Sequence, residues 1–416
     1  MKNLQINADR LWDSLMELAQ IGATAKGGVC RLALTNLDKQ GRDLFVRWCQ
    51  EAGCKISIDA MGNIFARRPG RDNSRPPIMT GSHLDSQPTG GKFDGAYGVL
   101  AGLEVVRTLN DLDYQTEAQL EVVAWTNEEG SRFAPAMVGS GVFTQVFELD
   151  YGLTRADQEG HTIQQELQRI GYAGPEQPGE HPVGAYFEAH IEQGPILEAE
   201  GKSIGIVQGA QGQRWYEVTV TGQEAHAGPT PMPSRRDALV GAARMIDAVN
   251  RIGMERQPNA CATCGMLSVM PNSRNVIPGQ VWFTVDLRHP DDAVLAEMDQ
   301  VVRQTFARIA EASKLELEVE QIWHFPATAF DTSCIAAVRK GAEQAGYSSL
   351  DIISGAGHDA VYMAKIAPTA MIFVPCENGI SHNEIENATP DDLAAGCNVL
   401  LHAMLEQANK GQAHEH

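Results

Sequence analysis

The sequence has 416 residues, of which 43% are hydrophobic and 21% are charged, and its formal net charge is −20 at pH 7. This length and composition are typical of a globular chain with two or more domains and a large core, and exclude a disordered one. The acidic excess disfavours nucleic acids and anionic membrane surfaces as partners, because their phosphates would be repelled.

The first predicted element is an amphipathic helix within residues 1–22, with Leu11, Leu15 and Leu18 on its apolar side. This segment has no apolar leader core, and no run in the chain approaches the length of a membrane span. We therefore expect a cytoplasmic protein that does not bind membranes.

From residue 40 to about residue 210, helical and strand patterns alternate. A helix is predicted within 95–112, and strands are predicted at 55–67, 76–83 and 118–127. Strands separated by crossover helices form a largely parallel sheet. Functional side chains gather at the carboxyl ends of such strands, where His83 and the pair 128–129 would lie.

The pattern then changes to strict alternation by twos. The predicted order is strand, helix, hairpin, helix and strand, over the segments 213–223, 226–252, 266–290, 291–315 and 316–324. This β-α-β-β-α-β order predicts a small α+β sandwich of four antiparallel strands and two helices.

After residue 328 the α/β pattern returns, with a helix at 333–346, a loop at 354–360, a strand at 368–376 and a closing helix from Asp391. We therefore predict an α/β protein whose catalytic domain is split by an insertion. The predicted ranges are 1–212 and 328–416 for the catalytic domain and 213–327 for an inserted lid and dimerisation domain.

Five side chains of the types that bind metal ions stand in glycine-rich or acidic turns far apart in the sequence: His83, Asp94, Glu129, His190 and His382. Imidazole and carboxylate ligands suit Zn²⁺, and one carboxylate can bridge two ions because each oxygen serves one of them. We expect Asp94 to be the bridge, with His83 and His190 on one ion and Glu129 and His382 on the other. Each residue alone is typical of an ordinary loop; the set together predicts a two-metal hydrolase.

Two further carboxylates accompany this set. Glu128 precedes Glu129 after an apolar segment, and consecutive side chains of an extended backbone diverge, so one can bind metal while the other meets the attacking water. A carboxylate in that place can accept the proton of the water and deliver it to a leaving nitrogen. The alternative is a pair of surface acids, which the apolar lead-in disfavours. Asp85 lies two residues beyond His83 and is expected to hold its free ring nitrogen.

The chain resembles the hydantoinase/carbamoylase family of amidohydrolases, a branch of the dinuclear-zinc aminopeptidase and carboxypeptidase-like hydrolases. The strings that carry the resemblance are GSHLDSQPTGGKFDG, NEEGSRFAPAMVGS, HIEQGPILE, AHAGPTPM, PNSRNVIPG, SGAGHDA and GISHNE. They cover almost the whole chain. The resemblance implies the same five metal ligands, with Asp94 bridging, and Glu128 as general acid/base. Other peptidase branches have an aspartate where this chain has His190.

The resemblance also implies substrate contacts. His226 would stabilise an oxyanion, and in this superfamily that histidine often comes from the partner subunit; seen alone, it is an ordinary loop residue. Arg288 would hold a substrate carboxylate with its planar guanidinium, for which a hairpin salt bridge is the alternative. Further contacts are expected from Gln193, Gln211, Arg214, Asn275, Gly357 and His358.

The resemblance implies a metal-dependent amidohydrolase that cleaves the ureido C–N bond of N-carbamoyl amino acids to give an amino acid, CO₂ and ammonia, as in hydantoin utilisation. Metal-bound hydroxide would be the nucleophile, and Glu128 would move the proton. Two divalent ions are expected per subunit, Zn²⁺ before Mn²⁺, Co²⁺ or Ni²⁺. The substrate would be a small ureido compound carrying a carboxylate. The inserted domain would close over it and support a homodimer.

Several alternatives stay open at this point. Allantoate amidohydrolase and β-ureidopropionase use the same centre on other ureido compounds. A di- or aminoacyl peptidase would have an aspartate at position 190. A metal-stabilised binding protein without turnover would have lost Glu128 or a ligand, and none is lost.

Overall fold

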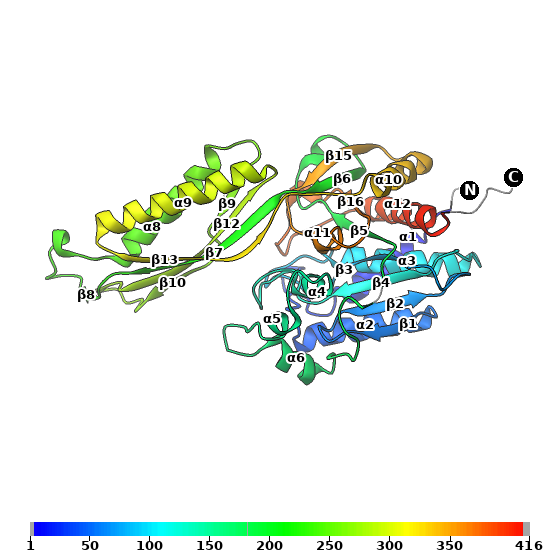
Figure 1. The fold of residues 1–416 in the computed structure, drawn as a ribbon, viewed down its shortest axis with the longest axis horizontal. Helices are drawn as coiled ribbons and strands as arrows, with labels where there is room; N and C mark the ends of the chain where they lie inside the picture. The colour runs from blue at the N-terminus through cyan, green and yellow to red at the C-terminus, as the bar shows by residue number, and fades with distance from the viewer. Residues whose placement is uncertain (1–3, 181, 411–416) are drawn as a thin grey trace. The chain divides into compact units, whose positions relative to one another are not determined.

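The computed structural model describes residues 4–180 and 182–410, and the chain divides into two compact units (Figure 1). Unit 1 comprises Met1–Gly209 and Ala329–His416, and unit 2 comprises Ala210–Thr328. Unit 2 is thus inserted between two segments of unit 1. None of the helices in the described residues is long and apolar enough to cross a membrane.

Unit 1 is built on a mixed sheet with the strand order β1-β2-β4-β3-β5-β16-β6-β14, and β15 pairs with β6. The strands are β1 Lys55–Ile58, β2 Ile64–Arg68, β3 Ile78–His83, β4 Leu120–Trp125, β5 Ala185–Ile191, β6 Ile204–Ala210, β14 Thr328–Ala329, β15 Ser349–Ser354 and β16 Thr369–Val374. The central pairs β3–β4, β3–β5 and β5–β16 are parallel. These four strands are buried along their whole length, as parallel strands covered on both faces must be, and they confirm the predicted sheet.

Helices cover this sheet. They are α1 Ala8–Leu18, α2 Asn36–Glu51, α3 Ala96–Asp111, α4 Val138–Phe143, α5 Leu149–Leu153, α6 Ile163–Ile170, α7 Ile196–Ala199, α10 Thr332–Ala345, α11 Asp359–Met363 and α12 Pro390–Ala408. The helices α3 and α12 pack on each other and on β5, so two segments far apart in the sequence cover the core together. Both helices are buried over most of their length, which is why their sequences are apolar on several sides.

Unit 2 has its own core, formed by one face of an antiparallel sheet and two helices. The strand order is β10-β12-β7-β13, and β9 also pairs with β12. The elements are β7 Gly212–Thr221, β8 Ala225–His226, α8 Ala238–Met254, β9 Cys261–Thr263, β10 Leu267–Met270, β11 Val276–Ile277, β12 Gln280–His289, α9 Asp292–Ser313 and β13 Glu316–Phe325. The inserted sheet domain is therefore present, with β9 as an additional short strand beyond the four predicted.

One predicted strand differs in the structure. The segment 55–67 forms two antiparallel strands, β1 and β2, joined by a turn at residues 59–63. Gly62 has a φ of +76°, and a Cβ there would meet a side-chain carbon of Leu167 at 2.4 Å. The glycine therefore allows both the left-handed backbone and the close approach that the turn needs.

Candidate active site and metal centre

The carboxyl ends of adjacent strands bring the five predicted metal ligands together. His83 is the last residue of β3 and His190 lies near the end of β5, its parallel neighbour. Asp94 lies in the loop that enters α3, Glu129 follows β4, and His382 follows β16. Strand order therefore explains why residues so distant in sequence converge at one edge of the sheet.

Asp94 stands at the centre of this group. Its Oδ1 lies 3.2 Å from His190 Nε2 and 3.6 Å from His83 Nε2. Its Oδ2 lies 3.2 Å from His382 Nε2, which is also 3.2 Å from Glu129 Oε2. Each oxygen of Asp94 thus faces a separate cluster of ligand atoms.

These clusters fit two metal ions. In the triad His83, Asp94 and His190, and again in the triad Asp94, Glu129 and His382, the ligand atoms all lie within 4.8 Å of one another. Glu129 Oε1 is buried without a hydrogen-bond partner, as expected of an oxygen that a cation would engage. Burial alone would raise the pKa of Asp94, but hydrogen bonds from His190, His382 and His83 outweigh it and hold that pKa well below its usual range. The donor set, imidazole and carboxylate, suits Zn²⁺.

The remaining ring nitrogens are held by backbone carbonyls. His83 Nδ1 lies 2.9 Å from the carbonyl oxygen of Asp85, and His190 Nδ1 lies 2.9 Å from that of Ile191. In this arrangement each Nδ1–H donates and each Nε2 faces Asp94. The carboxylate of Asp85 was expected on His83, but its nearer oxygen is 3.9 Å away. Its two oxygens instead accept hydrogen bonds from the backbone N–H groups of Glu128 and Glu129, which lie in the segment that follows β4.

Glu128 is buried beside the ligands, with its Oε2 3.3 Å from His83 Nε2. Burial raises the pKa of Glu128 well above the usual carboxyl value, against the attraction of His83 and together with repulsion from Asp359. The preceding Asn127 has a φ of 55°, a left-handed conformation that is costly for a residue with a side chain. Such strain is common where a backbone must aim functional groups. A buried carboxyl that holds its proton more strongly can exchange one with a neighbouring group.

Two other predicted contacts lie next to this centre. Gln193 Nε2 donates to Asp94 Oδ2 and to Ser381 Oγ, both at 3.0 Å. His358 is buried, and its ring centroid lies 4.5 Å from that of His190. Gly357 immediately precedes it in the loop before α11. His358 therefore supports a ligand ring as well as bordering the site.

Unit 2 holds the other predicted contacts, in two separate places. His226 on β8 is paired with Val276 of β11, beside the exposed Asn275. At the opposite end of the long strands, Arg288 lies across from Gln213 on β7, near Gln211 and Arg214. Arg288 donates from Nη2 to Asp286 Oδ2 at 2.7 Å, and Arg214 pairs with Asp299 at 2.9 Å.

The distance between these two places follows from the strand register. Gln280, the first residue of β12, pairs with Thr221, and Arg288 follows it by eight residues. An extended strand of that length spans about 25 Å. Figure 1 shows β8 beyond the end of β10 and β13 within unit 2. Within one copy of unit 2, His226 and Arg288 therefore lie at opposite ends of the long strands.

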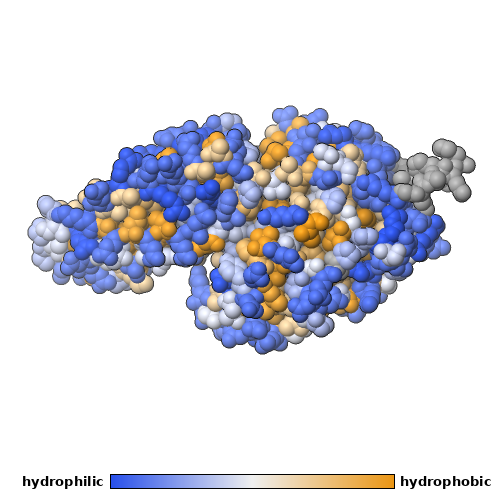
Figure 2. Space-filling view, in the orientation of Figure 1, coloured by the Kyte–Doolittle hydropathy of each residue, from blue (hydrophilic) through white to orange (hydrophobic). Residues whose placement is uncertain are grey.

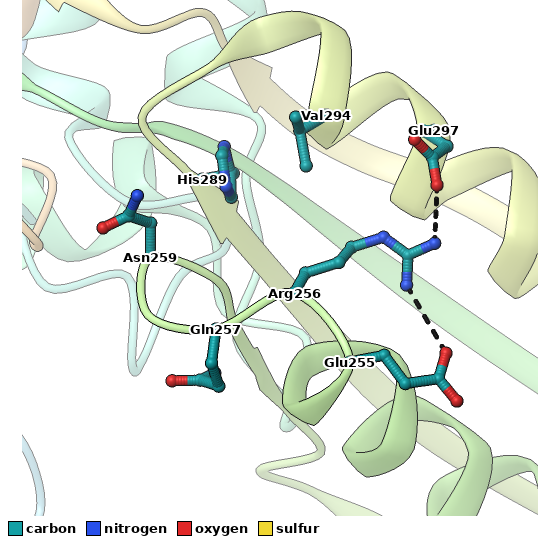
Figure 3. Close-up of a pocket in the computed structure, with 7 residues that line it drawn as sticks. All are labelled: Glu255, Arg256, Gln257, Asn259, His289, Val294 and Glu297. Atoms are coloured by element: carbon teal, nitrogen blue, oxygen red, sulfur yellow. Dashed lines mark hydrogen bonds and ion pairs between the residues drawn. The ribbon is translucent and has the colours of Figure 1, made fainter.

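A pocket of about 450 Å³ also lies in unit 2 (Figure 3). It is lined by Glu255, Arg256, Gln257, Asn259, His289, Val294 and Glu297. The guanidinium of Arg256 in this pocket forms ion pairs with Glu297 at 2.7 Å and with Glu255 at 3.8 Å. Because its positive charge is balanced, this pocket offers little to a substrate carboxylate, and none of the predicted site residues lines it.

Two residues beside the centre were not predicted. Glu386 is buried and accepts hydrogen bonds from the backbone of Phe93 and Asp94, and Ser381 links it to Gln193. The sequence signal was available, since both residues flank His382 in the string ISHNEIE. Their role depends on contacts with a loop nearly 300 positions earlier, which no local pattern reveals.

Comparison with known proteins gives consistent matches. The profile of the peptidase family M20/M25/M40 matches residues 79–406. The chain is 51% identical to the N-carbamoyl-L-amino-acid amidohydrolase of Rhizobium meliloti over 98% of each chain, and 34% identical to the allantoate amidohydrolase of Bacillus subtilis (strain 168) over 95% of this chain and 97% of that one. A crystal structure of an amidase of the hydantoinase/carbamoylase family from Burkholderia vietnamiensis superposes with a TM-score of 0.97 at 64% identity, covering 98% of this chain and 99% of that one.

Proposed function

Because this chain belongs to peptidase family M20/M25/M40, and within it to the hydantoinase/carbamoylase amidases, hydrolases that act on C–N bonds, we propose that it cleaves the ureido C–N bond of N-carbamoyl-L-amino acids. The products are the amino acid, CO₂ and ammonia. The observation that carries the proposal is the arrangement around Asp94, whose two oxygens face two separate ligand clusters with Glu128 alongside.

Two divalent ions, when bound by His83, Asp94, Glu129, His190 and His382, supply Lewis acidity at the scissile carbonyl and make water more acidic. Zn²⁺ suits these ligands best, with Mn²⁺, Co²⁺ and Ni²⁺ as alternatives.

Glu128 moves the proton in this scheme. As the carboxylate it takes a proton from the attacking water, and as the acid it gives that proton to the leaving amino nitrogen, so that the C–N bond breaks without expelling an amide anion. Burial supports this role, because it raises the pKa of Glu128 well above the usual carboxyl value. The side chains of His83, Asp94, Glu128 and His190 are buried in unit 1, which limits the access of bulk water to the proton.

Substrate binding is proposed to involve Gln193, Gly357 and His358 from unit 1. Arg288 is proposed to hold the substrate carboxylate while keeping Asp286, since a guanidinium has five donors. Gln211 and Arg214 lie at the same end of unit 2 and are proposed to assist. Hinge motion of unit 2 as a lid would bring these groups to the substrate and exclude water.

His226 and Asn275 are proposed to act from a second copy of the chain, with His226 stabilising the oxyanion. Their position supports this assignment, because they lie beyond the Gln280 end of β12, and Arg288 is eight residues, or about 25 Å, further along that strand. The edge strand β10 also supports a homodimer through unit 2. Met266, Leu267 and Met270 on and beside it are 44–54% exposed, and hydrophobic side chains reach the surface of unit 2 on the face shown in Figure 2.

A mixing experiment tests the dimer. His226→Ala and Glu128→Gln should each inactivate the homodimer, but a mixed dimer has one site with both residues intact if His226 acts on the partner's site. After unfolding and refolding an equimolar mixture, about a quarter of the wild-type activity should return. Recovery of no activity, from a mixture that light scattering shows to be dimeric, would place His226 in its own subunit's site.

The substrate is tested with one panel. Protein reconstituted with Zn²⁺ is assayed for ammonia with N-carbamoyl-L-amino acids, their D-enantiomers, N-carbamoyl-β-alanine and allantoate. The proposal expects the highest kcat/KM for the L-carbamoyl compounds. Allantoate is the second candidate, because allantoate amidohydrolases are 34% and 32% identical to this chain. A clear preference for allantoate or N-carbamoyl-β-alanine would replace the proposed substrate.

A further inference from the structure

Glu386 connects two segments that carry metal ligands. It is only 3% exposed and lies four residues after His382. Its Oε1 accepts hydrogen bonds from the backbone N–H groups of Phe93 at 3.0 Å and Asp94 at 3.1 Å. A single carboxylate oxygen therefore holds the peptide from which the central Asp94 side chain projects.

The second oxygen of Glu386 continues the connection. Ser381 Oγ donates to Glu386 Oε2 at 2.7 Å, and Gln193 Nε2 donates to Ser381 Oγ at 3.0 Å. Gln193 Nε2 also donates to Asp94 Oδ2 at 3.0 Å. The hydrogen bonds form a closed ring that begins at the backbone of Asp94 and returns to its side chain. Removing one member of such a ring leaves the others unpaired.

The packing around the ring leaves little freedom. A Cβ on Gly91 would lie 2.1 Å from Cδ and Oε1 of Glu386, so the missing side chain of Gly91 provides the space that the carboxylate fills. Gln193 and His382 have φ values of 58° and 53°. A left-handed conformation is unfavourable for a residue with a side chain, and persists only where surrounding contacts hold it. The ring supplies such contacts to both segments.

We propose that Glu386 is a positioning residue that sets the direction of Asp94, so that its two oxygens reach the two ligand clusters, and that through Ser381 it orients Gln193. Glu386 touches neither substrate nor metal in this role. The inference rests on the proposed function in one respect, namely that Asp94 bridges two ions.

The test measures zinc binding rather than turnover. Metal-free protein is titrated with Zn²⁺ in competition with a chromophoric chelator. Glu386→Ala should weaken zinc binding by about 10–100-fold. Glu386→Gln should stay within a few-fold of wild type, because its amide oxygen can accept the same two N–H groups and its NH₂ can donate to Ser381. Gly91→Ala should weaken zinc binding in the same way, because its Cβ would push the Glu386 carboxylate out of position although the glutamate itself is not substituted.

Glu104→Ala is the matched control. Glu104 is 1% exposed and accepts hydrogen bonds from Arg10 and Thr108, so its removal also leaves buried donors unpaired, but outside the metal centre. It should lower thermal stability and leave zinc affinity unchanged. Hydrogen exchange of the metal-free protein gives a second measurement, in which Glu386→Ala should speed exchange at Phe93 and Asp94.

The outcomes separate this inference from the proposed function. A wild-type protein that binds no pair of zinc ions would overturn the proposed function, while the exchange measurement would still test Glu386. A wild-type protein that binds two zinc ions, with Glu386→Ala binding them equally well, would overturn the positioning role. Equal losses in Glu386→Gln and Glu386→Ala would also overturn it, because charge and not hydrogen-bond geometry would then be responsible.

Discussion

The strands of the two units bury their residues in different ways. In unit 1, the strands β3, β4, β5 and β16 are buried at every position. In unit 2, the long strand β12 alternates between half-buried and buried residues along its whole length. A sheet covered on both faces places any charged residue at its strand ends in a low-dielectric environment, where that charge needs a partner.

The charged side chains of the two units differ in burial in the same way. Unit 1 buries Asp85, Asp94, Glu128 and Glu129 near one another, an excess of negative charge that divalent cations can neutralise. In unit 2, Arg214, Arg256 and Arg288 form ion pairs at half-buried positions. Closely spaced buried carboxylates therefore lie in unit 1, while these three arginines of unit 2 keep partly exposed ion pairs.

The largest effect is expected for Glu128→Gln, which removes the proposed proton carrier from unit 1. kcat should fall about 10²–10⁴-fold, while the zinc content of the purified variant stays the same. Glu320→Gln, on an exposed position of β13 in unit 2, is the control and should keep wild-type kcat. Ordinary turnover by Glu128→Gln with its metals bound would contradict the assignment.

Removal of metal should destabilise unit 1 alone. A ligand present at about 1,000 times its Kd stabilises the folded state by about 4 kcal/mol, and chelation should reverse this. Hydrogen exchange with and without chelator would locate the effect, with faster exchange expected in β3, β5 and the loop of Asp94 and none in β7 or β12. Equal changes in both units would show that the metal ions stabilise the whole chain and not unit 1 alone.

Arg288→Lys tests whether unit 2 contributes to recognition. A lysine cannot form the two parallel hydrogen bonds of a guanidinium, so KM for a carbamoyl amino acid should rise about 10–100-fold with a smaller change in kcat. The control is Arg303→Lys on α9, where Arg303 pairs with Asp299. An unchanged KM would mean that Arg288 serves only its hairpin ion pair with Asp286.

The smallest effect is expected at Glu166, whose contribution to the free energy of unfolding depends on pH. A hydrogen bond from Arg169, then one from Arg132, lowers the pKa of Glu166 to about 2, against the effect of burial. The folded-state pKa is below the unfolded value of about 4.3, so the contribution is complete above that value and is lost as the pH falls toward 2.

Glu166→Gln should therefore lower the free energy of unfolding by about 2 kcal/mol at pH 7, and the difference from wild type should shrink between pH 4.5 and pH 2. Urea unfolding at several pH values measures it. Asp247→Asn breaks an exposed ion pair with Arg251 in unit 2 and should cost at most about 0.5 kcal/mol at any pH. A difference for Glu166→Gln that does not vary with pH would exclude the ion pair as its cause.

Local sequence patterns predicted much of the fold. Continuous apolar runs indicated β3, β4 and β16, and alternation indicated β7, β12 and β13. The strand β5 was not indicated, because Glu188 interrupts its apolar run. In the folded protein that carboxylate is buried and accepts hydrogen bonds from Ser82, Tyr186 and the backbone of Ala360. Its partners come from other segments, so its burial was not visible locally.

The residue types of the site and the periodicity of most strands could be predicted from the sequence alone, since both are properties of neighbouring positions. The folded structure was needed to show that the carboxylate of Asp85 accepts hydrogen bonds from backbone N–H groups and that Glu386 holds the loop of Asp94. It was also needed to show that His226 and Arg288 lie at opposite ends of the long strands. These are contacts between distant segments. Their geometry depends on strand order and register, which arise from the packing of the whole sheet and are not encoded in any single stretch of residues.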